Sequence, residues 1–201
     1  MKLYFAPGAC SLSPHICLRE IGLQFDLEQV DLAAKKTKSG GDYWKINPKG
    51  YLPALEIRPG EVMTEGPAIV QYISDQKPDA GLVPKAGTAE RYRAQERLNF
   101  ISSEIHKTLG WMFNPQLPEA FRTIAVDRLG KRFDALSADL DGKQYLAGDK
   151  FGAADAYLFT VMRWTPKLKV SLDKWPNLTA FMDRVAKRPK VQEALKAEGI
   201  A

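Results

Sequence analysis

The chain has 201 residues, enough for one large domain or two small ones, and its composition of 45% hydrophobic and 26% charged residues is typical of a globular protein. The formal net charge of +5 is modest, and the basic residues are spread among acidic ones, which argues against a nucleic-acid-binding surface. No apolar stretch is long enough for a signal peptide or a membrane span, so we expect a cytoplasmic protein that binds no membrane.

The first residues predict a strand, a turn and a helix. Leu3 to Phe5 have strand character, Pro7-Gly8 break the strand, and Ser13-Pro14 are typical of an N-cap followed by proline at the first helical position. Cys10 therefore lies in the turn ahead of a helix N-terminus, where free amides and the helix dipole favour a thiolate and lower the thiol pKa. The alternative is that Cys10 is simply a small buried residue.

Two other residues of this segment carry weaker signals. Cys17 lies two helical turns from Cys10, too far for a disulfide, and neither cysteine belongs to a CxxC pair or a zinc-ligand set. We therefore expect both cysteines to be reduced and no metal site. His15 follows Pro14 in the first helical turn, and we expect it at the surface.

Strand and helix signals alternate through the first 75 residues. A helix of about residues 14–22 ends at Gly22, and residues 25–32 alternate as a strand should, which completes a βαβ unit. A polar loop at 35–41 precedes a short helix at 42–47. Strands at 52–57 and 61–64 flank the turn Arg58-Pro59-Gly60, and a further helix opens with Pro67. The pattern is βαβ followed by ββα.

The second half reads as helical. Residues 77–88 contain the prolines and glycines of a linker, so we place a domain boundary there. Long helices are predicted at 88–113 and 118–140, and an apolar, buried helix at 153–164. Two short helices open at Trp175-Pro176 and Arg188-Pro189.

Polar residues with helical spacing mark the first long helix. Asn99, Ser103, His106 and Gly110 form one narrow stripe, which either lines a cleft or is a plain solvated face.

Two turns of the first half also offer binding groups. Glu65-Gly66-Pro67 places a carboxylate at a helix N-terminus, which suits a ligand with both a carboxylate and an ammonium group, although an acidic residue there also simply stabilises the first turn. Lys35 can meet a second ligand carboxylate or be solvated. Pro53 cannot donate to a sheet, which leaves the backbone of Leu52 free to bind.

The order of these motifs resembles the cytosolic glutathione transferases along the whole chain. The resemblance rests on the thiol before the first helix, on residues 47–55 (NPKGYLPAL), on Thr64-Glu65-Gly66, and on residues 151–156 (FGAADA) in a helical second half. Residues 7–11 (PGACS) and 103–107 (SEIHK) are similar to the bacterial beta class, in which a cysteine replaces the tyrosine or serine of other classes.

The resemblance implies an α/β thioredoxin-like domain at 1–77 that binds glutathione, a linker at 78–88, and an all-α domain at 89–201 that forms the hydrophobic second-substrate site. It also implies a homodimer. Cys10 and His106 would be catalytic and face the glutathione sulfur, and a cis Pro53 would follow the Leu52 backbone. The implied glutathione contacts are Cys10, Lys35, Leu52, Pro53, Glu65, Gly66, Asn99, Ser103, Glu104, His106 and Lys107, and Trp111, Met112, Phe113 and Trp164 would line the hydrophobic pocket.

Two positions depart from the family pattern. Gly66 stands where many relatives have serine, which removes a hydroxyl contact but keeps the N–H. Gly152 stands where a serine or threonine usually caps the buried helix ahead of Asp155, and glycine caps almost as well.

The function implied is a transferase that conjugates the glutathione thiol, as co-substrate, to hydrophobic electrophiles in detoxification. A glutathione-dependent thiol-disulfide oxidoreductase or reductive dehalogenase that uses Cys10, and a non-catalytic carrier of hydrophobic ligands, stay open as alternatives.

Overall fold

A computed structural model describes all 201 residues of the chain. The chain forms two compact units, one of residues 1–83 together with 188–201 and one of residues 84–187. The C-terminal segment therefore belongs with the first unit, which differs from the predicted domain of 89–201. The physical reason is that helix α9 (Pro189–Glu198) packs along helix α1 (Leu12–Glu20), and the Arg188 guanidinium binds both carboxylate oxygens of Glu20 at 2.8 Å.

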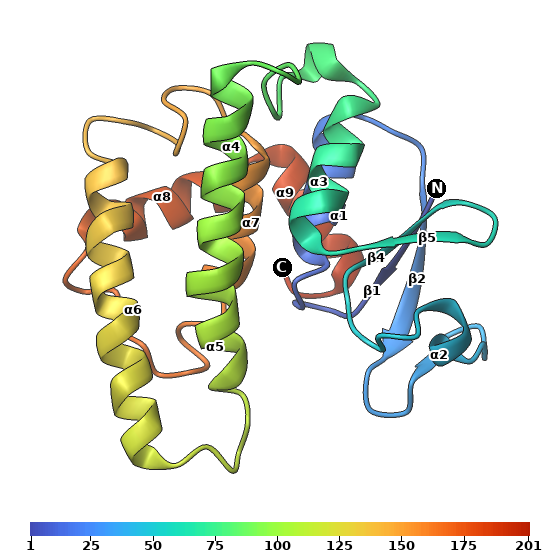
Figure 1. The fold of residues 1–201 in the computed structure, drawn as a ribbon, viewed down its shortest axis with the longest axis horizontal. Coiled ribbons are helices and arrows are strands. Elements are labelled where there is room, and N and C mark those ends of the chain that lie inside the picture. Colours follow the sequence, from blue (N-terminus) through green and yellow to red (C-terminus); the bar gives the residue numbers. More distant parts are fainter. The chain divides into compact units, whose positions relative to one another are not determined.

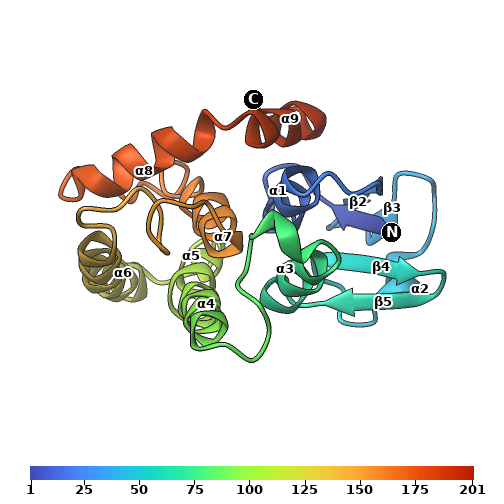
Figure 2. The ribbon, with the colours of Figure 1, turned by 90° about the horizontal axis from the view of Figure 1, so that it is seen from above.

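The first unit contains a five-stranded mixed sheet in the order β3-β2-β1-β4-β5. Strand β1 runs parallel to β2 and antiparallel to β4, and β4 pairs with β5 in the predicted hairpin. Helices α1 and α3 lie side by side on one face of the sheet (Figure 2). The strands of the sheet are β1 (Lys2–Phe5), β2 (Asp26–Asp31), β3 (Lys36–Thr37), β4 (Ala54–Arg58) and β5 (Glu61–Thr64). The unit also contains the helices α2 (Tyr43–Ile46) and α3 (Gly66–Asp75).

Alternation along the strands divides the core of this unit. Successive side chains point to opposite faces of a strand, so Leu3 and Tyr4 bury on different faces of β1. The Tyr4 ring packs against Tyr43 of α2 at a centroid distance of 5.9 Å, in a cluster with Val30 and Ala54. The predicted βαβ-ββα order is confirmed, except that the predicted polar loop at 35–41 contains the two-residue strand β3, which pairs with β2. The partly buried Leu52 packs against the Tyr4 cluster, which therefore supports the loop that precedes β4.

The second unit is helical (Figure 1). The predicted helix at 88–113 is a single rod made of α4 (Ala89–Phe100), a π-helical segment (Ile101–His106) and α5 (Lys107–Trp111). Helix α7 (Ala153–Met162) is buried at every position, as its composition predicts, and the Asp155 carboxylate accepts a hydrogen bond from the N–H of its N-cap, Gly152, at 2.8 Å. The other helices are α6 (Glu119–Asp139) and α8 (Pro176–Ala186), and a single 3-10 turn (Pro78–Ala80) precedes this unit in the chain.

Two local predictions in α1 are wrong. The helix begins at Leu12 with Ser11 at the N-cap, not at Ser13-Pro14. Pro14 is tolerated at the third helical position because the first four N–H groups of a helix have no intrahelical acceptor. His15 is fully buried rather than at the surface: its Nδ1 lies 2.8 Å from Glu198 of α9, and its Nε2 accepts a hydrogen bond from Arg19.

Candidate active site

Cys10 is mounted between β1 and α1, as predicted. The turn is closed by Ser11, whose hydroxyl exchanges hydrogen bonds with the Ala6 backbone, and the Ala9 N–H donates to the Ala6 carbonyl at 3.0 Å. The Cys10 thiol donates to the carbonyl oxygen of Leu52 at 3.2 Å. This contact joins the first turn of the unit to the loop before β4.

The predicted lowering of the Cys10 pKa is wrong for the ligand-free protein. Burial, the dominant effect, raises the pKa of the Cys10 thiol to about 12, although hydrogen bonds from the backbone N–H groups of Cys10 and Ser11 act in the opposite direction. Desolvation thus outweighs the helix N-terminus. Cys10 is a protonated hydrogen-bond donor at neutral pH, which agrees with its contact to the Leu52 carbonyl, and neither cysteine of the chain forms a disulfide.

The Leu52-Pro53 peptide bond is cis, as the resemblance implied. Pro53 is buried, and β4 begins directly after it. The carbonyl of Leu52 accepts the Cys10 thiol, whereas the Leu52 N–H forms no hydrogen bond within the chain. The N–H of Leu52 is thus a free backbone donor at this turn, whereas the predicted freedom of the Leu52 backbone does not extend to its carbonyl.

Lys35, in the connection between β2 and β3, reaches the loop that precedes β4. Its ammonium group donates to the Gly50 carbonyl at 2.7 Å and lies 5.5 Å from the centroid of the Trp44 ring. Gly50 has a φ of +68°, and a Cβ there would lie 2.5 Å from the Trp44 ring, so only glycine fits. Lys35 thus anchors the loop with one of its three donors, and the other two have no acceptor in the chain.

Glu65 and Gly66 form the N-terminus of α3. Glu65 is the N-cap with a φ of +70°, an uncommon conformation for a non-glycine residue, and its side chain is 66% exposed. Its carboxylate lies 3.3 Å from the Lys49 ammonium. Pro67 has no N–H, and the amides of Gly66 and Ala68 have no acceptor in the chain, so a carboxylate and two free donors share one helix terminus.

In the second unit, His106 belongs to an aromatic cluster at the end of the π-helical segment. Its Nδ1 lies 2.5 Å from the hydroxyl of Tyr157 on α7, and its ring centroid lies 5.1 Å from that of Trp164. The Phe113 ring extends the cluster through an edge contact with Trp164 at 5.6 Å. The cluster therefore joins one predicted catalytic residue to two of the predicted hydrophobic-pocket residues.

The predicted polar stripe is divided between solvent and the aromatic cluster. Asn99, Ser103 and Gly110 are exposed, whereas His106 belongs to the cluster, and the Ser103 hydroxyl donates to the Asn99 carbonyl within the helix. Lys107 and Glu104 lie outside this stripe, and Lys107 is exposed. Glu104 points to α6, where its carboxylate binds Arg128 at 2.8 Å and Arg132 at 2.7 Å, which lowers the pKa of Glu104. Because both arginines bind this carboxylate, Glu104 stabilises the packing of the helical unit and is not free to bind glutathione in the way that the resemblance implied.

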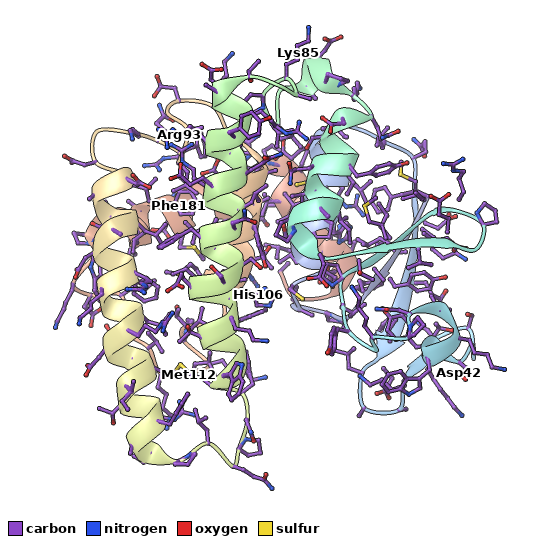
Figure 3. All side chains as sticks on the ribbon, viewed as in Figure 1. Asp42, Lys85, Arg93, His106, Met112 and Phe181 are labelled. Atoms are coloured by element: carbon purple, nitrogen blue, oxygen red, sulfur yellow. The ribbon has the colours of Figure 1, made fainter.

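The four predicted hydrophobic residues also separate. Met112 is buried and points into the space between α5 and α6 (Figure 3). Trp111 stacks on Phe121 of α6 and stays 53% exposed. Met112 and Phe113 line a cleft of about 690 Å³, whereas Trp111 and Trp164 are not among its lining residues.

Sequence reasoning missed the residues that form hydrogen bonds to the site residues and so fix their positions. Tyr157 carries no local signal because it lies in an apolar helix and meets His106 across 51 positions of sequence. Tyr43 and Asn47 both donate to the Tyr51 carbonyl, at 2.7 and 2.8 Å. Asn47 belongs to the motif at residues 47–55, but its contact with the Tyr51 carbonyl depends on the fold of the loop.

The structure contains neither a membrane-spanning helix nor a metal-binding cluster. No helix combines the length and the apolar character needed to cross a membrane. No group of three or more His, Cys, Asp or Glu side chains is arranged to hold a metal ion.

Comparison with known proteins agrees with this arrangement. Residues 1–75 match the family model of the glutathione S-transferase N-terminal domain, and residues 100–189 match that of the C-terminal domain. The chain is 44% identical to a glutathione S-transferase of Escherichia coli O157:H7, with all of both chains covered. It superposes on the beta-class enzyme of Sphingomonas chungbukensis with a TM-score of 0.95 and 46% identity, and on a sphingomonad glutathione S-transferase complexed with glutathione with a TM-score of 0.95 and 43% identity, in both cases over all of both chains. The chain therefore belongs to the glutathione S-transferase family, and its structure matches the bacterial beta class.

Proposed function

We propose that the protein conjugates the glutathione thiol to hydrophobic electrophiles and that the first unit holds the glutathione. One observation carries this proposal. The Cys10 thiol donates a hydrogen bond to the Leu52 carbonyl, while the N–H groups of Leu52, Gly66 and Ala68 have no acceptor in the chain. Unpaired donors at a turn and at a helix terminus match an extended peptide with a carboxylate at its end.

Each end of glutathione has a complementary group. The α-carboxylate of the γ-glutamyl residue accepts from the Gly66 and Ala68 amides, and its ammonium group binds Glu65. The cysteinyl carbonyl accepts from the Leu52 N–H. The glycine carboxylate is met by the two donors that Lys35 has left. These contacts fix the glutathione sulfur toward the Cys10 turn, where the α1 N-terminus stabilises negative charge.

Cys10 acts as a donor in this mechanism. A thiol that stays protonated at neutral pH can turn its one S–H from the Leu52 carbonyl to the glutathione thiolate, which then forms a bond to the electrophilic carbon as the leaving group departs. The raised pKa of Cys10 favours this role over direct nucleophilic attack by the protein. His106, held by the Tyr157 hydroxyl, is the second polar group that we assign to the thiolate.

The second unit supplies the apolar surface for the electrophile through Phe113 and Trp164. We further propose a homodimer, in which the exposed residues Asn99, Ser103 and Lys107 complete the polar surroundings of glutathione. Thiol-disulfide exchange at Cys10 is the second candidate function, since a cysteine already seated at the cis-proline turn needs only deprotonation to attack a disulfide.

Assays of wild type and Cys10→Ala separate these functions. With glutathione and an aryl halide, we expect both proteins to form the thioether, because the α1 N-terminus remains in the variant. Thiol-disulfide exchange, the second candidate, would instead add one glutathione to the intact mass of the wild type treated with oxidised glutathione and none to that of the variant. Loss of both activities in Cys10→Ala would contradict the donor role, and no turnover of any electrophile by the wild type would favour a carrier.

A further inference from the structure

One peptide group of the first unit is held by side chains that the proposed mechanism does not use. The carbonyl oxygen of Tyr51 accepts two hydrogen bonds, from the Tyr43 hydroxyl at 2.7 Å and from the Asn47 side-chain amide at 2.8 Å. A carbonyl oxygen has two lone pairs, so both are engaged. The N–H of the same peptide group is that of Leu52, which has no partner in the chain.

The two donors are themselves fixed. Tyr43 is fully buried and packs against Tyr4, and Asn47 is 3% exposed. The Asn47 side-chain oxygen accepts from the Lys49 N–H at 3.1 Å, and its backbone N–H donates to the Tyr43 carbonyl at 2.8 Å. The Tyr51 side chain is 66% exposed, so the backbone of this residue is anchored although its side chain is not.

The geometry of a peptide group transmits this anchoring to Leu52. A peptide group is planar, and in the trans form its C=O and N–H point in opposite directions. Donors that fix the Tyr51 oxygen therefore also fix the direction of the Leu52 N–H. Two accepted hydrogen bonds also polarise the peptide group and strengthen its N–H as a donor. A donor that is already oriented loses less freedom when a ligand binds.

We propose that Tyr43 and Asn47 are positioning residues for glutathione, which aim the Leu52 N–H at the main chain of the bound tripeptide by holding the Tyr51 carbonyl. This inference rests on the proposed function, since it assigns a role in glutathione binding. In this role neither side chain needs to contact glutathione. Their hydroxyl and amide groups act only through the Tyr51-Leu52 peptide group.

The test compares two tyrosines of the same core cluster. Tyr43→Phe removes the hydrogen bond to Tyr51, and Tyr4→Phe is the matched control because the Tyr4 hydroxyl donates to Glu56, away from this loop. We expect Tyr43→Phe to raise both the Kd and the KM for glutathione about five- to tenfold, because a Leu52 N–H that is less oriented and less polarised before binding forms a weaker bond to the ligand. The kcat at saturating glutathione should change less than twofold, and Tyr4→Phe should leave the Kd and KM unchanged.

Two further readouts separate positioning from a structural effect. The 15N frequency of an amide responds to hydrogen bonds at the carbonyl of its own peptide group, so the Leu52 signal of free Tyr43→Phe should move, and that of Tyr4→Phe should not. Asn47→Asp keeps the acceptor for Lys49 but loses the donor to Tyr51, and it should also raise the KM for glutathione.

Equal KM values for glutathione in Tyr43→Phe and Tyr4→Phe, or an unmoved Leu52 signal, would overturn the inference and leave the proposed function intact. A wild-type protein that binds no glutathione would overturn both.

Discussion

The two units present different kinds of groups to a ligand. The first unit offers backbone donors at Leu52, Gly66 and Ala68, held by turns whose geometry is fixed by buried side chains. The second unit offers aromatic rings, Phe113, Trp164 and the ring of His106, joined by edge contacts. Directional donors select one ligand, whereas ring surfaces accept many. The comparison predicts strict specificity for glutathione and broad tolerance for the electrophile.

The thiol of the first unit gives the largest expected effect. Because burial raises the pKa of Cys10 to about 12, the thiolate fraction near pH 8.5 should be about a thousandfold below that of an ordinary cysteine. Iodoacetamide alkylation of the ligand-free protein, followed by intact mass, should accelerate only well above pH 9, and Cys10→Ala should show no adduct at this site. A midpoint near pH 7 would mean that the helix N-terminus dominates after all.

Glu65 tests the polar end of the first unit. Glu65→Ala should weaken glutathione binding by about 1.5–3 kcal/mol, or roughly ten- to more than a hundredfold, because a charge-assisted bond to the ligand ammonium is lost. Calorimetry measures the change. Glu61→Ala is the matched control, since Glu61 is an exposed carboxylate of β5 that forms an ion pair with Arg58 at 3.1 Å. Equal affinities in the two variants would refute the site assignment.

Trp164 tests the tolerance of the second unit. Trp164→Phe should raise the KM for an apolar electrophile about two- to fivefold and leave the glutathione KM unchanged, because one aromatic contact surface shrinks. Trp175→Phe is the control, since Trp175 packs on Phe133 and donates to Asp134, apart from the His106 cluster. An equal response of both variants, or a rise in the glutathione KM, would contradict the division of roles.

Glu104 should give the smallest effect. Glu104→Ala leaves Arg128 and Arg132 without their shared carboxylate, so we expect the free energy of unfolding to fall by about 1 kcal/mol and the glutathione Kd to stay unchanged. Urea denaturation and calorimetry measure the two quantities. A weaker affinity for glutathione would return Glu104 to the pocket that the resemblance implied.

Local signals predicted the parts of the molecule that a few neighbouring residues determine. Proline, glycine and capping preferences within a short stretch of sequence determine three such parts: the strand-turn-helix around Cys10, the turn at Leu52-Pro53, and the start of α3 at Glu65-Gly66. The Cys10 turn was therefore placed correctly, although its helix starts earlier than predicted.

Contacts between distant segments could not be predicted in the same way. His15 is buried because α9 returns to cover α1, and Glu104 is neutralised by arginines of α6. The Cys10 pKa depends on how much water the folded unit excludes, which no local pattern reports. The π-helical segment at 101–106 likewise has more residues per turn than an α-helix, so the polar residues predicted to form one stripe from α-helical spacing do not all lie on one face.

Amide mapping by NMR tests the central claim, that backbone donors of the first unit bind glutathione. Glutathione is titrated into 15N-labelled protein, and the shifts of all amides are followed to saturation. We predict that the Leu52, Gly66 and Ala68 signals move the most, because each N–H gains its first acceptor. Saturable binding that leaves these three signals unmoved would contradict the account.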